Sequence, residues 1–307
     1  MLRPGRQGCS EMTVPKESGK REPFCRGPAT DGSELIHVDC AGHVYPDGSI
    51  GIHNMCFHVR VDEIVALCGA NGSGKSTLIE HLNGLLTPSE GSVAVLGKKV
   101  DESVRSGLWR EVGVVFQRTD DQLFAPTVLD DVMFGPLNSG MSQAEAKERA
   151  ESSLAAVGAL DLVQKMPHYL SGGQKRLVAI AGILAMRPRI IALDEPTSDL
   201  DPVHTERIEN LIRKVRDEYH ISIVIATHDL DLAARIADRI CIVKDGSILA
   251  EGTPAEVFYD DELLREAGLK KPLAVQVYGE YCRRRGIGMR EKPVRLEEFL
   301  TSILREI

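Results

Sequence analysis

The stretch that decides the fold runs from residue 64 to residue 78 and reads Ile64-Val65-Ala66-Leu67-Cys68-Gly69-Ala70-Asn71-Gly72-Ser73-Gly74-Lys75-Ser76-Thr77-Leu78. Its apolar start predicts a buried strand, and its glycine-rich turn leads into a helix that begins at Lys75. This is the G-x-x-x-x-G-K-[ST] pattern in the strand–turn–helix context that it requires. The glycines allow successive backbone N–H groups to point at a phosphate, and the helix N-terminus adds positive charge. The stretch therefore predicts a nucleoside triphosphate site rather than a glycine turn that only caps a helix. Lys75 should reach the β- and γ-phosphates, and the Ser76 hydroxyl should bind Mg²⁺.

The composition is typical of a globular α/β protein. Of 307 residues, 43% are hydrophobic and 27% are charged, and the net charge is −8. The acidic balance and the lack of a face-sized basic cluster argue against a nucleic-acid partner. No apolar run approaches the ~18 residues that span a bilayer, and no signal-peptide pattern follows the N-terminal charges, so we expect the chain in the cytoplasm. The seven cysteines form no C-x-x-C motif, which indicates reduced thiols. The nine histidines show no pair at the spacing of metal ligands, so we expect no metal site beyond a nucleotide-bound Mg²⁺.

Three parts are expected along the chain. Residues 1–33, rich in Gly, Pro, Ser and charge, predict a disordered tail. Residues 34–267 predict one α/β domain, with a helical subdomain at about 120–187 and with strands at 35–45 and 50–61 joined by a turn. Residues 268–307 predict a C-terminal extension of two helices, at about 273–285 and 295–306. The second helix carries one apolar stripe, for which we expect a place in the core and keep a subunit contact as the alternative: Leu296, Phe299, Leu300, Ile303 and Leu304.

Polar side chains follow three further apolar runs that read as strands. They are Gln117, the adjacent pair Asp194 and Glu195, and His228. Because ligands bind at the carboxyl ends of strands in open α/β sheets, these side chains should share one edge with Gly69. Asp194 suits the Mg²⁺ that a phosphate loop needs, Gln117 can touch both the ion and a water, and Glu195 can orient or deprotonate a water. The structural alternatives are a helix-capping carboxylate and a histidine that is merely hydrogen-bonded at the start of a loop.

A second helix N-terminus in the chain is suited to anions. Ser171-Gly172-Gly173 precedes a helix predicted from Gln174 to Met186. Further along, Asp201 followed by Pro202 predicts the N-cap of another helix. One chain therefore carries two helix ends of the kind that bind phosphate.

Two aromatic positions have alternative interpretations. Tyr45 ends a predicted strand ahead of the phosphate loop, where it is either a plate on which adenine stacks or a half-buried strand residue. Leu123 and Phe124 are apolar residues in a polar, turn-prone setting. They belong either to the core or to an exposed patch that binds a partner.

In the order and spacing of these motifs, the chain resembles an ATP-binding-cassette ATPase over about residues 34–260. The segments and residues that carry the resemblance are 69–77, Gln117, 170–174, 190–195, 198–201 and His228. Leu-Ser-Gly-Gly-Gln at 170–174 is that family's own signature. The resemblance implies an α/β fold with a phosphate-loop core, an antiparallel β subdomain and a helical signature subdomain.

The resemblance also implies a shared site. Two such chains, identical or related, sandwich two ATP molecules, each between the phosphate loop of one chain and the signature of the other. In this family pattern Glu195 activates the attacking water, His228 contacts the γ-phosphate, and Gln117 reports the γ-phosphate to the helical subdomain. The implied catalytic residues are Glu195, His228, Gln117 and Lys75, and the implied Mg²⁺ ligands are Ser76, Gln117 and Asp194. The implied nucleotide-binding residues are Tyr45, Gly69, Ala70, Asn71, Gly72, Ser73, Gly74, Lys75, Ser76, Thr77, Ser171, Gly172, Gly173, Gln174 and Asp201.

A finer resemblance is to the ATPase subunits of energy-coupling-factor importers, especially the cobalt/nickel branch. It rests on the segments 45–48, 120–124, 131–137 and 178–186. It implies a peripheral protein on the cytoplasmic face of the cell membrane, with a second ATPase subunit, a membrane coupling subunit and a substrate-binding membrane subunit as partners. The alternatives are a vitamin importer, a soluble cassette ATPase and a non-catalytic regulator. Cys68, Ala70 and Asp199 depart from the family pattern, in which a non-cysteine, a proline and a small residue are more usual.

Overall fold

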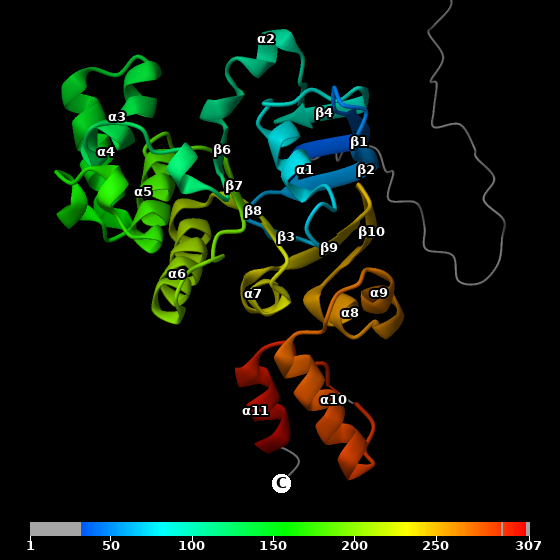
Figure 1. The fold of residues 1–307 in the computed structure, drawn as a ribbon. Coiled ribbons are helices and arrows are strands. Elements are labelled where there is room, and N and C mark those ends of the chain that lie inside the picture. The colour runs from blue at the N-terminus through cyan, green and yellow to red at the C-terminus, as the bar shows by residue number, and fades with distance from the viewer. Residues whose placement is uncertain (1–31, 290, 305–307) are drawn as a thin grey trace, which may run out of the picture.

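The computed structural model describes residues 32–289 and 291–304. The tail predicted at 1–33 lies outside the described residues except for its last two positions. Figure 1 shows two sheets stacked near the centre, a helical lobe beside them, and a pair of C-terminal helices that extends away from the rest. Among the described residues, no helix combines the length and the apolar character needed to cross a bilayer.

The larger sheet has six strands in the order β10-β9-β3-β8-β7-β6. Strands β9, β3, β8, β7 and β6 run parallel, and β10 pairs antiparallel with β9 at one edge. The strands are β3 (Ile64–Cys68), β6 (Val112–Val115), β7 (Ile190–Asp194), β8 (Ser222–Thr227), β9 (Arg239–Lys244) and β10 (Ser247–Gly252). The carboxyl ends of four predicted strands therefore meet at one edge, as the sequence indicated.

The smaller sheet is antiparallel, with the order β2-β1-β4-β5. Its strands are β1 (Glu34–Val44), β2 (Ile50–Arg60), β4 (Glu90–Val95) and β5 (Lys98–Lys99). The two strands predicted at 35–45 and 50–61 agree with β1 and β2 to within one residue. This sheet is the antiparallel β part of the predicted fold class.

Buried side chains alternate between two hydrophobic clusters on opposite faces of the larger sheet. In β3, Ala66 and Cys68 belong to the cluster that includes the helical lobe, whereas Val65 and Leu67 belong to the cluster shared with the smaller sheet. Both faces are covered, so the parallel strands read as continuous apolar runs instead of alternating ones. This explains why the sequence shows these strands so clearly.

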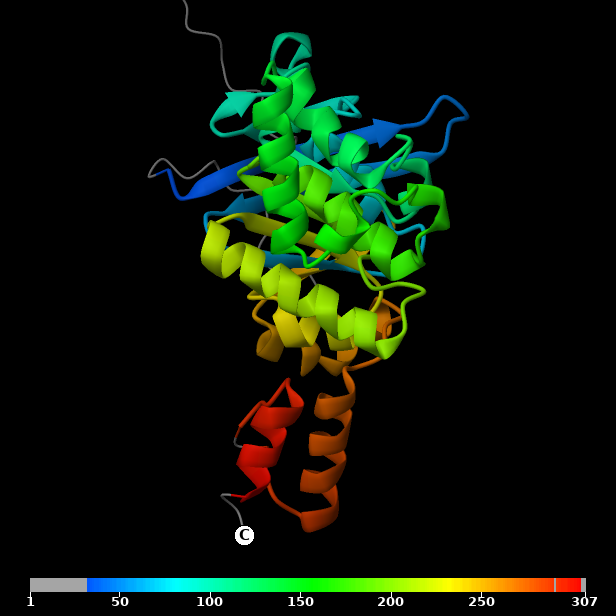
Figure 2. The same ribbon diagram turned by 90° about the vertical axis from the view of Figure 1, so that its left-hand side faces the viewer.

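Helices surround the sheets and form the lobe (Figures 1 and 2). The helices are α1 (Lys75–Leu82), α2 (Glu102–Arg105), α3 (Val128–Asn138), α4 (Gln143–Ala156), α5 (Gly172–Leu184), α6 (Pro202–Tyr219), α7 (Leu230–Ile236), α8 (Pro254–Phe258), α9 (Asp261–Glu266), α10 (Leu273–Arg285) and α11 (Leu296–Leu304). The lobe consists of α3, α4 and α5, which pack on one another. The predicted helix start at Gln174 is wrong by two residues, because Ser171 caps α5 in a capping box with Gln174 as its third residue.

The expectation that the last helix buries its whole apolar stripe is wrong. Of the apolar stripe only Phe299 is buried, against Tyr278 and Cys282 of α10, while Ile303 is partly covered. Leu296, Leu300 and Leu304 are at least half exposed. The reason is geometric, since a helix paired with one other helix buries a narrower stripe than a helix that lies on a sheet. The domain boundaries at 34, 120–187 and 268 stay predictions.

Candidate nucleotide site

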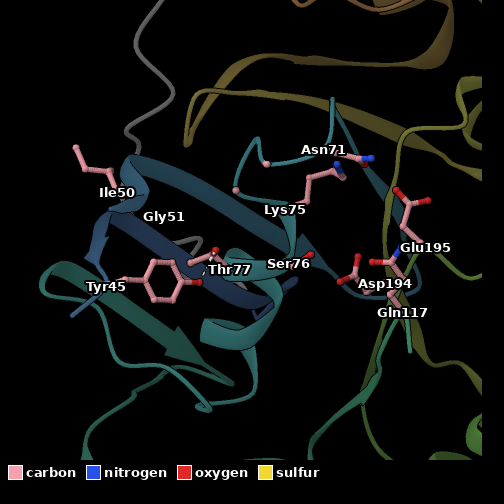
Figure 3. A pocket seen from close by; sticks show the side chains of 12 residues that line it. Tyr45, Ile50, Gly51, Asn71, Lys75, Ser76, Thr77, Gln117, Asp194 and Glu195 are labelled. Carbon is pink, nitrogen blue, oxygen red and sulfur yellow. Dashed lines mark hydrogen bonds between the residues drawn. The ribbon is translucent and has the colours of Figure 1, made fainter. Parts of the chain in front are cut away.

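A cavity of about 340 Å³ opens at the carboxyl edge of the parallel strands (Figure 3). Its wall is formed by the phosphate loop and α1, by the β1–β2 turn with the first residues of β2, and by residues at the carboxyl ends of β6 and β7. The lining residues are Tyr45, Ile50, Gly51, Asn71, Gly72, Gly74, Lys75, Ser76, Thr77, Gln117, Asp194 and Glu195. Ten of the predicted site residues are thus brought together around one cavity.

The phosphate loop is curled in the way that its glycines predict. Gly72 and Gly74 have φ angles of +78° and +104°, which residues with a Cβ adopt only with strain. Gly74 occupies the N-cap position of α1, where no side chain caps the helix, and the first turn of α1 carries no acidic residue. The first N–H groups of α1 therefore remain available to an anion from outside the chain.

The phosphate loop is supported by hydrogen bonds and close packing with residues that the sequence analysis did not identify. Gly246, in the β9–β10 turn, donates its N–H to the carbonyl of Ser73 at 2.9 Å and accepts an N–H bond from His53 of β2. A Cβ at Gly69 would lie 2.3 Å from the carbonyl oxygen of Val243, so this glycine is required by close packing. The loop thus rests on both sheets at once, which fixes its shape without a ligand.

Lys75 crosses the loop. Its Nζ donates to the carbonyl oxygens of Gly69 and Ala70 at 2.8 and 2.9 Å, and the side chain is only 5% exposed. Burial lowers the pKa of Lys75, and the nearby carboxylates of Glu195 and Asp194 oppose that change. The ammonium group is therefore held at the position where phosphate oxygens are predicted, with two carbonyls as its present acceptors.

Ser76, Asp194 and Gln117 offer a hydroxyl, a carboxylate and an amide oxygen to the same cavity. Burial raises the pKa of Asp194, while a hydrogen bond with Ser76 acts in the opposite direction, and Figure 3 shows these two side chains toward one another. A cation beside Asp194 would favour its charged form and so offset the cost of burial. This hard oxygen donor set fits Mg²⁺, which supplies charge neutralisation at the phosphates when it is bound.

Glu195 is tightly held beside Asp194. It is 5% exposed and lies in a left-handed backbone conformation with φ of +47°. Its Oε1 accepts the backbone N–H of His228 at 3.0 Å and ring Nδ1 of His228 at 2.7 Å, and its Oε2 accepts the hydroxyl of Thr227 at 3.2 Å. A carboxylate only accepts, so Nδ1 carries the proton. His228 itself is half exposed and orients Glu195 without lining the cavity.

Gln117 is connected to the helical lobe through Arg176 of α5. The Arg176 guanidinium donates to the carbonyl oxygens of Phe116 and Gln117 at 2.9 and 3.1 Å, and the side chain is 4% exposed. A movement of the Gln117 backbone must therefore either carry α5 with it or break two charge-assisted hydrogen bonds. Sequence reasoning missed Arg176, because an arginine on a helix gives no signal of a partner 60 residues away.

The signature residues 171–174 lie outside the nucleotide cavity of their own chain. Ser171 is exposed at the start of α5, and neither it nor any of residues 172–174 lines the cavity within the described part of the chain. Gly173 is needed for packing, since a Cβ there would lie 2.3 Å from the ring of His204. Asp201 caps α6 and accepts from the N–H of His204 at 3.0 Å, so in one chain it serves the helix and not the cavity.

Comparison with known proteins identifies the family. The ABC transporter family model matches residues 52–198. The energy-coupling factor transporter ATP-binding protein EcfA of Methanocaldococcus jannaschii is 49% identical over 230 residues, which cover 74% of this chain and 82% of that protein. The chain belongs to the ABC transporter ATP-binding family.

Solved structures of ATP-binding cassettes also match the fold of this chain. The structure of cbiO1 from Clostridium perfringens, part of the ABC transporter complex cbiONQ, matches with a TM-score of 0.70 and 35% identity over 82% of this chain and 99% of that one. A dimeric ATP-binding cassette in a post-hydrolysis state with ADP and Pi matches with a TM-score of 0.65 and 31% identity over 72% and 99%. An AAA-domain model also matches residues 163–234. The predicted fold class is confirmed, and the cassette is an ATPase that binds and hydrolyses ATP.

The side of the cavity that Tyr45 lines is shaped by a glycine that sequence reasoning missed. Tyr45 and Thr77 are hydrogen-bonded through their hydroxyls at 2.9 Å, and a Cβ at Gly51 would lie 2.8 Å from both side chains. Gly51 therefore makes room for the tyrosine ring. A glycine inside a strand pattern does signal close approach, but not what approaches.

Replacing Tyr45 by alanine should weaken ATP binding by about tenfold or more, because a base that stacks on an aromatic ring loses roughly 1–3 kcal/mol without it. Tyr45→Phe is the matched control, since it keeps the ring and removes only the bond to Thr77. Its affinity should stay within about twofold of the wild type. Titration with a fluorescent ATP analogue measures both, and equal losses in the two variants would assign Tyr45 to structure instead of stacking.

Proposed function

We propose that the cassette is the ATP-hydrolysing subunit of an energy-coupling-factor importer. The observation that carries this is the 49% identity to the EcfA protein of Methanocaldococcus jannaschii, together with the match to cbiO1, a component of the cbiONQ transporter complex. The cassette would work on the cytoplasmic face of the membrane, bound to a coupling subunit and a substrate-binding subunit. The net charge of −8 is compatible with protein partners and gives no reason for a nucleic-acid partner.

The cargo we propose is cobalt or nickel. Support comes from the four sequence segments that resemble the cobalt/nickel branch, at 45–48, 120–124, 131–137 and 178–186. A vitamin importer is the alternative, because the cargo is bound by membrane subunits and not by this chain. A soluble cassette ATPase is disfavoured, because the relatives described above are transporter ATP-binding proteins, and cbiO1 is part of a transporter complex.

The ATP site is shared between two copies of the chain. Each phosphate loop supplies one half, and Ser171–Gly173 of the other copy supplies the second. The placement of the signature outside the cavity of its own chain supports this, and so does the similarity to a dimeric cassette. The exposed N-terminus of α5 gives the γ-phosphate a second set of N–H donors.

The catalytic roles follow from the groups around the cavity. Lys75 and the loop N–H groups bind the phosphates, and Ser76 and Asp194, with Gln117, hold Mg²⁺. Glu195 takes the proton of the attacking water, with His228 keeping its carboxylate in place. Because Nδ1 of His228 is committed to Glu195, Nε2 can donate to the γ-phosphate only when the ring is doubly protonated.

A groove beside the lobe is suited to the membrane partner. A cavity of about 280 Å³ lies between the β6 edge and helices α3 and α5, and its lining is mostly apolar. Phe124 and Phe134 stand at its rim, 66% and 50% exposed, with their rings edge to face at 4.9 Å. Leu123 is partly buried against the core. This favours the exposed-patch interpretation for Phe124 and the core for Leu123.

Exchanging Phe124 and Phe134 together for serine should uncouple transport from hydrolysis. The isolated cassette should keep its ATPase rate, because neither ring touches the nucleotide cavity. Cargo uptake by the reconstituted complex should fall by at least about tenfold, since exposed aromatic anchors dominate interface energies. Unchanged uptake would remove the groove from the interface. Tyr169→Ser, which removes another exposed aromatic side chain, outside this groove, is the control.

The proposal as a whole is tested by purifying the native membrane complex through this chain and identifying its bound cargo. We expect two membrane proteins to co-purify and cobalt or nickel to be retained. A bound vitamin would overturn the cargo, and the absence of any membrane protein from a complex that still hydrolyses ATP would overturn the importer.

A further inference from the structure

Two cysteines face each other across the β1–β2 pair, and neither of them lines the nucleotide cavity. The Sγ atoms of Cys40 and Cys56 lie 3.5 Å apart, and the backbone N–H of Cys40 donates to Sγ of Cys56 at 3.4 Å. A carboxylate oxygen of Asp39 completes a group whose three donor atoms lie within 4.8 Å of one another. Among the described residues, this is the only group of three such donors.

A β-bulge builds this arrangement. Val38 pairs with Phe57 and Ala41 pairs with Met55, so two residues of β1, Asp39 and Cys40, stand opposite the single residue Cys56. In a regular strand, neighbouring side chains point to opposite faces, and Asp39 and Cys40 would not reach one partner together. Cys40 takes a left-handed conformation with φ of +45° to do so.

The third strand is adapted to the bulge. Gly91 of β4 lies beside it with φ of +75°, and a Cβ there would stand 2.3 Å from the carbonyl oxygen of Cys40 and 2.4 Å from that of Asp39. Only glycine allows the bulged backbone to approach so closely. The unusual conformation of Cys40 is thus supported from both neighbouring strands, which marks it as a built feature of the sheet.

The donor set and its spacing match a tetrahedral metal. Two thiolates on one zinc ion, each at about 2.3 Å, stand roughly 3.8 Å apart, close to the spacing seen here. Two sulfur ligands select zinc-type cations over Mg²⁺ or Ca²⁺, which prefer oxygen.

We propose that Asp39, Cys40 and Cys56 bind a thiophilic divalent cation of the zinc type. Three protein ligands leave one position for water. The cation clamps β1 to β2 five residues before Tyr45, and it is separate from both the Mg²⁺ of the nucleotide and the transported cargo. A test of this cation site therefore does not depend on whether the proposed transport function is correct.

The test uses the full chain, kept reduced by a phosphine and free of nucleotide, and titrated with Co²⁺ as a coloured substitute for zinc. We expect one Co²⁺ per chain, with the near-ultraviolet charge-transfer band of a cobalt–thiolate bond. Zn²⁺ should displace Co²⁺ and remove the band, because zinc favours tetrahedral sites with thiolate ligands. Binding should also raise the melting temperature of the wild type.

Variants locate the site. Cys40→Ser or Cys56→Ser should abolish the band, and Asp39→Asn should weaken binding by at least about tenfold. Asp39 is exposed, so its variant tests the site even if a cysteine variant folds poorly. Cys282→Ser, in the buried α10–α11 contact, is the matched thiol control and should bind normally.

Two outcomes would overturn the proposal. One is a thiolate band that persists in both Cys40→Ser and Cys56→Ser, or that is lost only when Cys9 and Cys25 are replaced. The other is no band in the reduced wild type, since the phosphine excludes a Cys40–Cys56 disulfide as the explanation. A wild-type melting temperature that does not respond to Zn²⁺ would count against the clamp in the same way.

Discussion

Glu195→Gln is expected to lower the ATPase rate by about two to four powers of ten while ATP still binds, because a positioned general base contributes that much to a hydrolysis. The amide keeps the shape of the side chain and can still bond His228 and Thr227, so the site should stay folded. It has no carboxylate to accept the proton of water. Single-turnover hydrolysis and nucleotide binding, measured on the same sample, separate the two effects.

The control for this variant is Glu209→Gln. Glu209 of α6 is another buried glutamate, 6% exposed, but it pairs with Arg235 of α7 and does not line the nucleotide cavity. Its replacement should affect stability and leave the catalytic constant per folded molecule unchanged. Near-normal turnover in Glu195→Gln would remove Glu195 from the role of base.

Ser171→Arg should abolish hydrolysis, with a loss of at least about a hundredfold, although the changed residue lies outside the cavity of its own chain. The arginine would occupy the space at the α5 N-terminus that the partner's nucleotide needs. ATP should still bind to each separate chain through the phosphate loop. Steady-state hydrolysis and binding by single chains give the two readouts.

Ser142→Arg is a closely matched control. Ser142 and Ser171 are both N-caps with complete capping boxes, on α4 and α5 respectively. Each substitution removes such a cap, which costs about 1 kcal/mol of stability, but only one disturbs the signature. If both variants lose activity equally, the loss comes from the helix cap and the shared site is wrong.

Much of the fold was predictable because its signals are local. The strands at 64–68 and 190–194 are buried on both faces and therefore read as continuous apolar runs. The capping boxes that begin at Ser142 and Thr253 are each complete within four residues of sequence. The cavity-lining residues of the loop, Gln117, Asp194 and Glu195 were predictable because strand ends converge at one sheet edge.

What the sequence missed depends on contacts between distant segments. Gly246 supports the phosphate loop from a turn 173 positions after Ser73, and Gly51 makes room for Tyr45. The pairing of Cys40 with Cys56 depends on a bulge, which shifts the strand register without leaving a sequence pattern. The exposure of Leu300 on α11 likewise depends on how few elements pack there.

Cys68 shows the limit of reading a local departure from a family pattern. An accessible thiol at this position, directly before the phosphate loop, would make the ATPase sensitive to alkylation. In the structure Cys68 is fully buried at the end of β3, and burial raises the pKa of its thiol. Both features make it unreactive. The interpretation as a small buried strand residue is the one that the structure favours.

The central claim is that two copies of the chain build each ATP site. The most direct measurement is the mass of the Glu195→Gln chain in solution, by light scattering, with and without ATP. The account predicts one chain without ATP, two with ATP, and one again when Ser171→Arg is added, whereas Ser142→Arg leaves the pair intact. A Glu195→Gln chain that binds ATP and remains single, or a pair that persists with Ser171→Arg, would contradict it.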